Sequence, residues 1–265
     1  MKKRDARKTI LMDHLLQQGR LSTQDVITFL GISLSSVRRL LIELEEEGKL
    51  LRVHGGVQVK NLTGDPYVFS EFKEQNPVEK KLIGQYAAEN LVSSGDVLYL
   101  DSGTTVFQFA LALKRCLQDS QVHDIRVVTN SLPNMEVLHD VADVTMIGGR
   151  FRDMRRDFAG YATERFLRFF NYQKAFLGAD GFDISSGFLG KDTDTARINE
   201  VIIKRSSDVY ILMDSSKFRH QSFVSYADLD SVKAVITDES IDTDIRQKCE
   251  EKALSIIVAQ PRLVR

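Results

Sequence analysis

The sequence predicts a two-domain protein of α/β class, with a small basic domain followed by a larger, mostly parallel α/β domain. Residues 1–60 hold 11 Lys and Arg against 7 Asp and Glu, although the whole chain has a formal net charge of −1. Apolar residues follow helical spacing in the first part, whereas the second part alternates short apolar runs with helical segments. Residues 59–80 contain two of the four prolines. We therefore expect a first domain of residues 1–60, a linker of residues 61–75 and a second domain of residues 76–265.

The composition is that of an ordinary globular protein. Of the 265 residues, 43% are hydrophobic and 28% are charged, which excludes a disordered or low-complexity chain. No run reaches the roughly 18 apolar residues that span a bilayer, and the N-terminus carries charges where a signal peptide needs an apolar core. We expect a cytoplasmic protein with no membrane partner. Cys116 and Cys249 are too few for a disulfide framework, and the five histidines form no ligand-spaced cluster, so we expect no metal and no cofactor.

The first domain is predicted to contain three helices and a hairpin. Apolar spacing predicts a helix over about residues 4–18. Ser22 and Asp25 have the spacing of a capping box for a second helix, which Gly31 ends. Ser33 is expected to cap a third helix. The sequence KLLRVHGGVQV then alternates around a Gly-Gly turn, as a two-stranded wing does.

The third helix is predicted to have two unlike faces. Its buried stripe contains Val37, Leu40, Leu41 and Leu44, which leaves Ser35, Ser36, Arg38 and Arg39 near the other face. A helix, a short turn with glycine and a second helix with polar residues near its start form the geometry that enters the DNA major groove. Arginine suits this place because its planar fork pairs bidentately with guanine or phosphate. The alternative is an ordinary solvated helix face, but the turn, the serine cap, the hairpin and the basic charge together favour DNA binding.

This N-terminal stretch also resembles a known family. RLSTQDVITFLGISLSSVRRLLIELEEEGKLLRVHGGV is similar to the winged helix-turn-helix of the DeoR family of bacterial sugar-responsive transcriptional regulators, whose pattern runs S-x-x-T-I-R-R-D-L and closes with R-x-H-G-G. Ser36 replaces the usual Thr, and Leu40 replaces the usual Asp. The resemblance implies a helix-turn-helix over about residues 20–39, with a recognition helix that extends to residue 47. The residues expected to contact DNA are Ser22, Thr23, Ser33, Ser35, Ser36, Arg38, Arg39, Arg52 and His54.

The second domain is predicted to contain a mostly parallel sheet covered by helices. Its apolar runs are VLYLD, IRVVTN, VTMIGG, KAFLGAD, VYILMD, KAVITD and LSIIVA. Segments of helical or turn character separate these runs, as in α/β proteins. Ligands of such sheets bind beyond the carboxyl ends of the strands. The residues that follow each run are therefore the candidates for a binding site.

Polar residues follow several of these runs. Gly103 permits a tight bend, and Thr104 and Thr105 open a helix whose N–H groups and dipole suit an anion. The ends of later runs supply Asn130, Ser131, Gly148, Gly149, Asp180, Asp183 and Lys217. A phosphate cradle, a lysine and carboxylates that accept from hydroxyls describe a site for a phosphorylated sugar. Each feature has a plainer alternative: the threonine turn can be a capped turn, the two aspartates can be turn formers, and Lys217 can be a solvated lysine. The recurrence of these polar residues at strand ends favours a binding site.

The second domain resembles the sensor domain of the same family over about residues 76–240. DSGTT, TNSLP, IGGRFR, FLGADGFD, NEVIIKR and DSSKF match its motifs in order. This sensor is similar in fold to ribose-5-phosphate isomerase and related sugar-phosphate enzymes. The effector-site residues that the resemblance implies are Asp101, Gly103, Thr104, Thr105, Asn130, Ser131, Gly149, Asp180, Asp183, Glu200, Lys204 and Lys217.

One loop separates this sequence from the isomerases that it resembles. In those enzymes a glycine-rich loop with a catalytic lysine follows the acidic motif, whereas SSGFLGKDTDTARINE stands here without the glycine run. Lys191 is the equivalent lysine and joins the expected effector site. Small positioning errors cost about 100-fold in rate, so the altered loop favours binding without turnover.

These observations predict a transcriptional regulator and not an enzyme. We expect a repressor of a carbohydrate-utilisation operon that binds double-stranded operator DNA and is controlled by a phosphorylated sugar. Because one winged helix contacts too few bases for adequate specificity, we expect a homo-oligomer, a dimer or tetramer, on paired half-sites. The alternative is a sugar-phosphate isomerase or deaminase fused to a DNA-binding domain.

Overall fold

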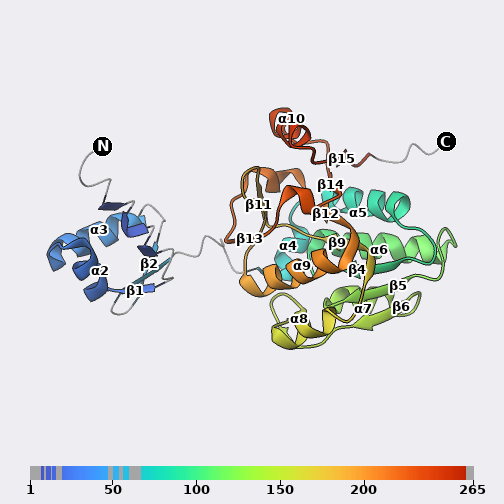
Figure 1. Cartoon of the computed structure of the whole chain (residues 1–265), viewed down its shortest axis with the longest axis horizontal. Coiled ribbons are helices and arrows are strands. Elements are labelled where there is room, and N and C mark those ends of the chain that lie inside the picture. Colours follow the sequence, from blue (N-terminus) through green and yellow to red (C-terminus); the bar gives the residue numbers. More distant parts are fainter. Residues whose placement is uncertain are drawn as a thin grey trace. The chain divides into compact units, whose positions relative to one another are not determined.

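The computed structural model forms two compact units, Met1–Asp65 and Pro66–Arg265 (Figure 1). Among the residues that the structure describes, no helix is long and apolar enough to cross a membrane. Each unit has its own hydrophobic core. The described residues are 7–8, 10–12, 14–15, 20–46, 50–53, 56–59 and 67–260.

The first unit combines helices with a small antiparallel sheet of strand order β1-β3-β2. The described parts of the first predicted helix are helical. A third strand, β1, precedes the second helix and pairs with β3, an addition to the predicted two-stranded wing. The elements are β1 (Arg20–Ser22), α2 (Thr23–Leu30), α3 (Leu34–Glu46), β2 (Leu50–Val53) and β3 (Gly56–Val59).

Local signals set the ends of α2 as predicted. The Ser22 hydroxyl accepts from the Asp25 amide at 3.0 Å, and the Asp25 carboxylate accepts from the Ser22 amide at 2.9 Å. This capping box is confirmed. Gly31 ends the helix with a φ of 59°, a left-handed conformation that glycine adopts without steric cost.

The predicted buried stripe of α3 is also confirmed, since Val37, Leu40, Leu41 and Leu44 are all buried in the core of the first unit. Leu40 stands where the family pattern has a carboxylate. Its burial explains how the substitution is accommodated, because an apolar side chain at this position adds to the core.

A seven-stranded sheet forms the centre of the second unit. All of its strand pairs are parallel, and each of the seven predicted apolar runs overlaps one strand. The strand order is β15-β14-β12-β9-β4-β5-β6. The strands are β4 (Val97–Leu100), β5 (Arg126–Thr129), β6 (Asp143–Met146), β9 (Tyr172–Leu177), β12 (Ser206–Leu212), β14 (Ala234–Thr237) and β15 (Ile256–Val258).

Helices cover both faces of this sheet. One core lies between the sheet and α5, α6 and α7, whereas the other lies between the sheet and α8, α9 and α10. Successive residues of β4 show the division, because Leu98 and Leu100 join the first core and Tyr99 joins the second. The helices are α5 (Pro77–Leu91), α6 (Thr104–Gln118), α7 (Leu132–Leu138), α8 (Tyr161–Leu167), α9 (Thr193–Arg205) and α10 (Thr243–Glu251).

Shorter elements complete the second unit. Strands β7 and β8 form a hairpin, and β10, β11 and β13 form a separate antiparallel sheet. These strands are only three or four residues long, so no apolar run predicted them. The elements are β7 (Arg150–Arg152), β8 (Asp157–Ala159), β10 (Gly181–Asp183), β11 (Gly187–Gly190), β13 (Val224–Ala227) and the 3-10 helices η1 (Ser215–Arg219) and η2 (Leu229–Ser231).

The segment 67–75, which the sequence assigned to the linker, is folded onto the second unit. It contains the short helix α4 (Phe69–Glu74), and Tyr67 and Phe69 are both buried. The Phe69 amide donates to the Met154 carbonyl at 2.8 Å, and the Phe69 ring packs edge-on against Phe107 of α6. Aromatic anchors therefore hold this segment in place.

The strand order places a topological switch point between β4 and β9. After β4 the chain adds β5 and β6 on one side, and it then returns to add β9 and the later strands on the other side. The loops that follow β4 and β9 diverge at such a point and leave a crevice at the carboxyl ends of the strands. This crevice is where the structure contains its candidate ligand pocket.

Candidate functional site

The exposed face of α3 carries the residues predicted to contact DNA. Ser35, Ser36, Arg38 and Arg39 are all exposed, and both arginines form no ion pair with another described residue. The Ser33 hydroxyl lies 3.1 Å from the Ser35 hydroxyl and 3.0 Å from the Ser36 hydroxyl. The start of the helix thus presents clustered hydroxyl groups beside two guanidinium groups, a combination suited to phosphate oxygens and base edges.

Sequence reasoning missed Leu34, the first residue of α3, which is 42% exposed. It lies one helical turn before Arg38, on the same side of the helix. An apolar side chain in this position could contact a thymine methyl group. The sequence did indicate this role, because Leu34 is an apolar residue at the helix start that lies outside the buried stripe.

Arg52 on β2 is exposed and lies next to an acidic side chain. Its guanidinium is 3.6 Å from the Glu45 carboxylate, and its amide donates to the same carboxylate at 3.0 Å. Such an exposed ion pair contributes only about 0–1 kcal/mol, so the side chain can leave it for a phosphate group. Ser22 and Thr23 lie at the start of α2, where Ser22 is engaged as the helix cap. His54 lies outside the described residues.

The candidate ligand pocket lies at the switch point of the large sheet. Its walls come from the loop after β4, the loop after β9, the segment 67–75 and side chains of α5, α9, β13 and η1. Six of the predicted effector-site residues meet here. They are Asp101, Gly103, Thr104, Thr105, Asp180 and Lys217.

The N-terminus of α6 opens onto this pocket. No side chain caps it, since Gly103 is the N-cap residue. Thr104 and Thr105 are buried and line the pocket. The first N–H groups of this 15-residue helix, the helix dipole and two hydroxyls therefore face the same space, which is the arrangement that binds phosphate in many proteins.

Three cationic side chains line the same pocket, namely Lys80, Arg155 and Lys217. Burial lowers the pKa of the Lys80 ammonium to about 8, and the nearby Lys217 also lowers it, against the opposing effect of Asp214. Burial alone would lower the pKa of Arg155, but the surrounding carboxylates, led by Asp180 and Asp192, raise it above its ordinary value. Arg155 therefore stays charged, whereas the charge of Lys80 depends on pH.

Several polar atoms in the pocket wall are buried without a hydrogen-bond partner among the described residues. They include the Tyr67 hydroxyl, the Asp101 Oδ1 and both polar atoms of the Asn199 side chain. Asp101 is held by its other oxygen, which accepts from the Gly178 amide at 3.1 Å. Burial raises the pKa of the Asp101 carboxyl. Unpaired buried groups of this kind are costly unless a ligand or water satisfies them, so they make this wall a candidate surface for ligand recognition.

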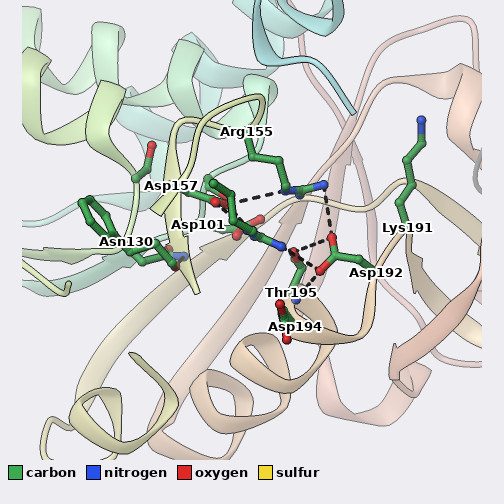
Figure 2. A network of polar contacts seen from close by, with 12 residues as sticks. Asp101, Asn130, Arg155, Asp157, Lys191, Asp192, Asp194 and Thr195 are labelled. Atoms are coloured by element: carbon green, nitrogen blue, oxygen red, sulfur yellow. Dashed lines mark hydrogen bonds and ion pairs between the residues drawn. The ribbon is translucent and has the colours of Figure 1, made fainter. Parts of the chain in front are cut away.

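A buried network of arginines and aspartates fixes one side of the pocket (Figure 2). Asp157 accepts from both the Nε and Nη2 atoms of Arg152 at 2.7 Å and from the Ser102 hydroxyl at 2.7 Å. Arg155 lies between Asp157 and Asp192, at 3.5 and 3.2 Å. The network joins the β7–β8 hairpin to the end of β4 and to the start of α9, where Asp192 is the N-cap.

Asp192 holds two guanidinium groups as well as the helix start. It pairs with Arg152 at 2.8 Å and accepts from the Thr195 amide at 2.8 Å. Burial acts to raise its pKa, but Arg155, Arg152 and the Thr195 hydrogen bonds outweigh burial and lower it. Asp192 is therefore a carboxylate at neutral pH, and it keeps Arg155 in the pocket wall.

Other predicted effector-site residues have structural roles outside the pocket. Asn130 is buried and bridges the Tyr99 hydroxyl and the Phe158 carbonyl, each at 2.8 Å. Ser131 caps α7. A Cβ atom on Gly149 would lie 2.0 Å from the Thr163 hydroxyl, so close packing explains this glycine. Asp183 accepts from the amides of Ser185 and Ser186 in the β10–β11 turn, which is the role of a turn former.

Glu200 and Lys204 lie on the outer side of α9. They line a second cavity with residues of α8 and α9, including Glu164, Arg168 and Arg197, and do not reach the pocket at the switch point. Lys191 lies at the edge of that pocket. Its amide donates to Asp180 at 3.0 Å, and its ammonium lies 4.0 Å from the centre of the Phe72 ring.

Sequence reasoning missed the pocket residues that come from outside the strand ends. They are Tyr67, Phe72, Lys80, Arg155, Thr195, Asn199 and Tyr226. The arginine-rich stretch RFRDMRRD was a usable signal for Arg155, because buried arginine is rare unless it is paired. The aromatic residues near position 70 were a second signal, since a solvated linker seldom needs them.

Comparisons with known proteins agree with this two-part organisation. The description "DeoR-like helix-turn-helix domain" fits residues 7–63, and "DeoR C terminal sensor domain" fits residues 75–239. Ribose 5-phosphate isomerase from Plasmodium falciparum matches with a TM-score of 0.40 and 17% identity, over 52% of each chain.

Two relatives match over most of their length. The HTH-type transcriptional regulator GlpR of Haloferax volcanii is 29% identical over 253 residues, 95% of this chain and 96% of that protein. The lactose phosphotransferase system repressor of Staphylococcus epidermidis is 28% identical over 239 residues, 88% of this chain and 91% of that protein. These relatives are regulators, which confirms the prediction of a regulator over that of an enzyme. The chain belongs to the DeoR family of transcriptional regulators.

Proposed function

We propose that this protein represses a carbohydrate-utilisation operon and that a phosphorylated sugar, bound in the pocket at the switch point, controls its affinity for operator DNA. One observation supports a phosphorylated ligand. The uncapped N-terminus of α6, with Thr104 and Thr105, opens onto the same pocket as Lys80, Arg155 and Lys217. A helix N-terminus opposite three cations is suited to a phosphate dianion.

The polar end of the pocket supports a sugar as the rest of the ligand. Asp101, Asn199 and Tyr67 offer buried oxygen and nitrogen atoms that have no partner among the described residues. A polyol satisfies such atoms with its hydroxyl groups, and an analogue that lacks a hydroxyl leaves them unpaired. We therefore assign the phosphate to the side of α6 and the sugar hydroxyls to Asp101, Asn199 and Tyr67.

The DNA partner follows from the exposed face of α3. Arg38 and Arg39 are assigned to the major groove, and Arg52 is assigned to the phosphate backbone. Names of relatives support repression of sugar genes, because one is a lactose phosphotransferase system repressor and another is a putative aga operon repressor. Operator binding requires access to the chromosome, so we also propose a cytoplasmic location.

We further assign a homo-oligomer, a dimer or tetramer, to the operator complex. Helix α8 and the turn that follows it carry Tyr161, Phe166 and Phe169, which are 74%, 55% and 69% exposed. Acidic Glu164 and basic Arg165 lie on the same short helix. Exposed aromatic residues flanked by both charges suit the self-complementary contact of a two-fold interface, so this face is assigned to a second copy.

The experiment that tests the ligand assignment replaces both threonines at the start of α6. Thr104→Val combined with Thr105→Val removes two hydroxyls at nearly constant shape. We expect ligand affinity to fall by about tenfold or more, since a hydrogen bond to a charged group contributes about 1.5–3 kcal/mol, while operator affinity without ligand stays unchanged. Isothermal titration with ribose 5-phosphate, glucose 6-phosphate and fructose 1-phosphate measures the first quantity, and fluorescence anisotropy of labelled operator measures the second.

Thr243→Val is the matched control, because Thr243 starts α10 outside the pocket. It should leave both affinities unchanged. If the double variant responds to the sugar phosphate at the concentrations that act on wild type, the phosphate site is misassigned and the start of α6 is an ordinary helix turn.

A further inference from the structure

The segment 67–75 forms one wall of the ligand pocket, although in sequence it follows directly on the first unit. Tyr67 and Phe72 both line the pocket, and their rings stack with centroids 4.6 Å apart. With this segment in place the cavity measures about 40 Å³, which is room for roughly three water molecules. A sugar phosphate needs more space, so part of the pocket wall must move to admit it, and this segment is one such part.

The two rings hold the cationic side chains of the pocket. The Arg155 guanidinium lies 4.1 Å from the centre of the Tyr67 ring. The ammonium groups of Lys191 and Lys217 lie 4.0 and 5.6 Å from the centre of the Phe72 ring. These are cation–π distances. The backbone is held as well, because the Lys80 ammonium donates to the Phe72 carbonyl at 2.6 Å.

The same cations are the groups that a phosphate would bind. Lys80, Arg155 and Lys217 line the pocket beside the start of α6, and Lys191 lies at its edge. A phosphate oxygen attracts a guanidinium or ammonium group more strongly than a ring face does, because the hydrogen bond is charge-assisted. The aromatic segment and the phosphate therefore compete for one set of cations.

We propose that Tyr67 and Phe72 are the residues through which the ligand pocket controls the DNA-binding unit. Ligand phosphate takes the cations from the two rings, and the segment 67–75 is released from the pocket wall. The mechanism rests on the proposed function, since it requires a phosphorylated ligand in this pocket. It also makes the segment a positioning element, which acts on DNA through the chain that it continues.

Chain connectivity carries the effect to the first unit. Tyr67 is two residues beyond Asp65, the last residue of that unit. Releasing the segment lengthens the connection between the two units, and this changes the freedom with which a DNA-binding unit reaches its half-site. A ligand that favours the released arrangement lowers operator affinity by the same factor by which operator DNA weakens ligand binding.

The test compares full-length wild type with Phe72→Leu, which keeps an apolar side chain and removes the ring face. In wild type, saturating sugar phosphate should lower operator affinity by about tenfold. The leucine variant should resemble ligand-bound protein even without ligand. We expect its operator affinity to be about tenfold weaker, its sugar-phosphate affinity to be several-fold tighter and its remaining response to ligand to be less than about twofold.

Phe72→Trp should restore the response, since tryptophan offers the best ring face for a cation. The chain contains no other tryptophan, so the emission of this residue reports directly on the segment. Sugar phosphate should shift that emission toward the value of solvent-exposed tryptophan. An unchanged spectrum at saturating ligand would show that the segment stays in the wall, and this result would overturn the proposal.

Phe170→Leu is the matched control. Phe170 is also half-buried, packs against Tyr172 with ring centroids 6.4 Å apart, and lies outside both the pocket and the segment 67–75. It should keep the wild-type response. Equal effects of the two leucine variants would assign the coupling to general packing of the second unit and would refute the competition. If no sugar phosphate binds wild type, the proposed function fails and the inference with it; if ligand acts equally on wild type and Phe72→Leu, the inference alone fails.

Discussion

Replacing Asp157 with asparagine is expected to destabilise the second unit by about 3–5 kcal/mol, because the change breaks a buried ion pair while keeping the shape of the side chain. Asp157 is fully buried, and the Arg152 side chain that it binds is only 11% exposed. Without the carboxylate, the Arg152 guanidinium keeps only Asp192 as an ion-pair partner among the described residues. An uncompensated buried charge is the most costly result of a single substitution.

The matched control is Asp208→Asn, which removes a carboxylate from an ion pair of the same length. The Asp208 and Lys233 groups are 2.7 Å apart, as are Asp157 and Arg152, but their side chains are 29% and 54% exposed. Such a pair contributes at most about 1 kcal/mol. The comparison therefore varies burial at constant distance.

Thermal unfolding followed by circular dichroism measures both effects. For a unit of this size, 1 kcal/mol corresponds to about 2–4 °C in the melting temperature, so Asp157→Asn should lower it by about 6–20 °C. Asp208→Asn should change it by less than about 4 °C. Similar shifts in the two variants would mean that the Arg152–Asp157 pair stabilises the unit no more than an exposed ion pair does. The argument that this pair fixes the pocket wall would then be refuted.

Three further predictions concern DNA, pH and assembly. Arg38→Ala or Arg39→Ala should reduce the binding free energy for operator DNA by about 1–3 kcal/mol and that for random DNA by less. Arg52→Ala should weaken binding to both DNAs equally and reduce its salt dependence. Equal losses on both DNAs for Arg38→Ala would exclude base contacts by Arg38. The affinity for sugar phosphate should fall as pH rises between about 7 and 9, since Lys80 with its pKa of about 8 loses its positive charge over that range. Lys80→Met should bind weakly with no such fall, and an unchanged pH dependence in this variant would assign the titration to another group. Phe166→Glu combined with Phe169→Glu should lower the molecular mass measured by sedimentation. Val78→Glu, at another exposed apolar residue, should not change that mass. A wild type that is monomeric at all concentrations would exclude the α8 interface.

The strands of the second unit were predictable because parallel strands buried on both faces appear as continuous apolar runs. Asp101, Thr104, Thr105 and Asp180 could be placed near one another for the same reason, since strand ends meet at one edge of the sheet. The rule does not say which strands are neighbours. The rule therefore assigned Asn130 and Asp183 to the site as well. In the structure Asn130 supports a loop and Asp183 forms a turn.

The residues that were missed depend on long-range contacts. Arg155 lies in the turn of a short hairpin, and the carboxylates of Asp157 and Asp192, far from it in sequence or in a separate strand, hold it in the pocket wall. Tyr67 and Phe72 lie in a stretch with proline and glycine at its start, which favoured the prediction of a linker. No local sequence pattern shows that Phe69 in that stretch packs against Phe107 of α6.

The folding of the segment 67–75 onto the second unit determines how this sensor can be transplanted. A fragment that begins at residue 76 follows the boundary drawn from composition, but it lacks Tyr67, Phe69 and Phe72 and so loses a wall of the pocket. A chimeric biosensor, in which another output domain replaces the DNA-binding unit, therefore needs its junction before Tyr67. Because the reporter is then fused to the pocket wall itself, a change in that wall can reach the reporter without any engineered contact between the two parts.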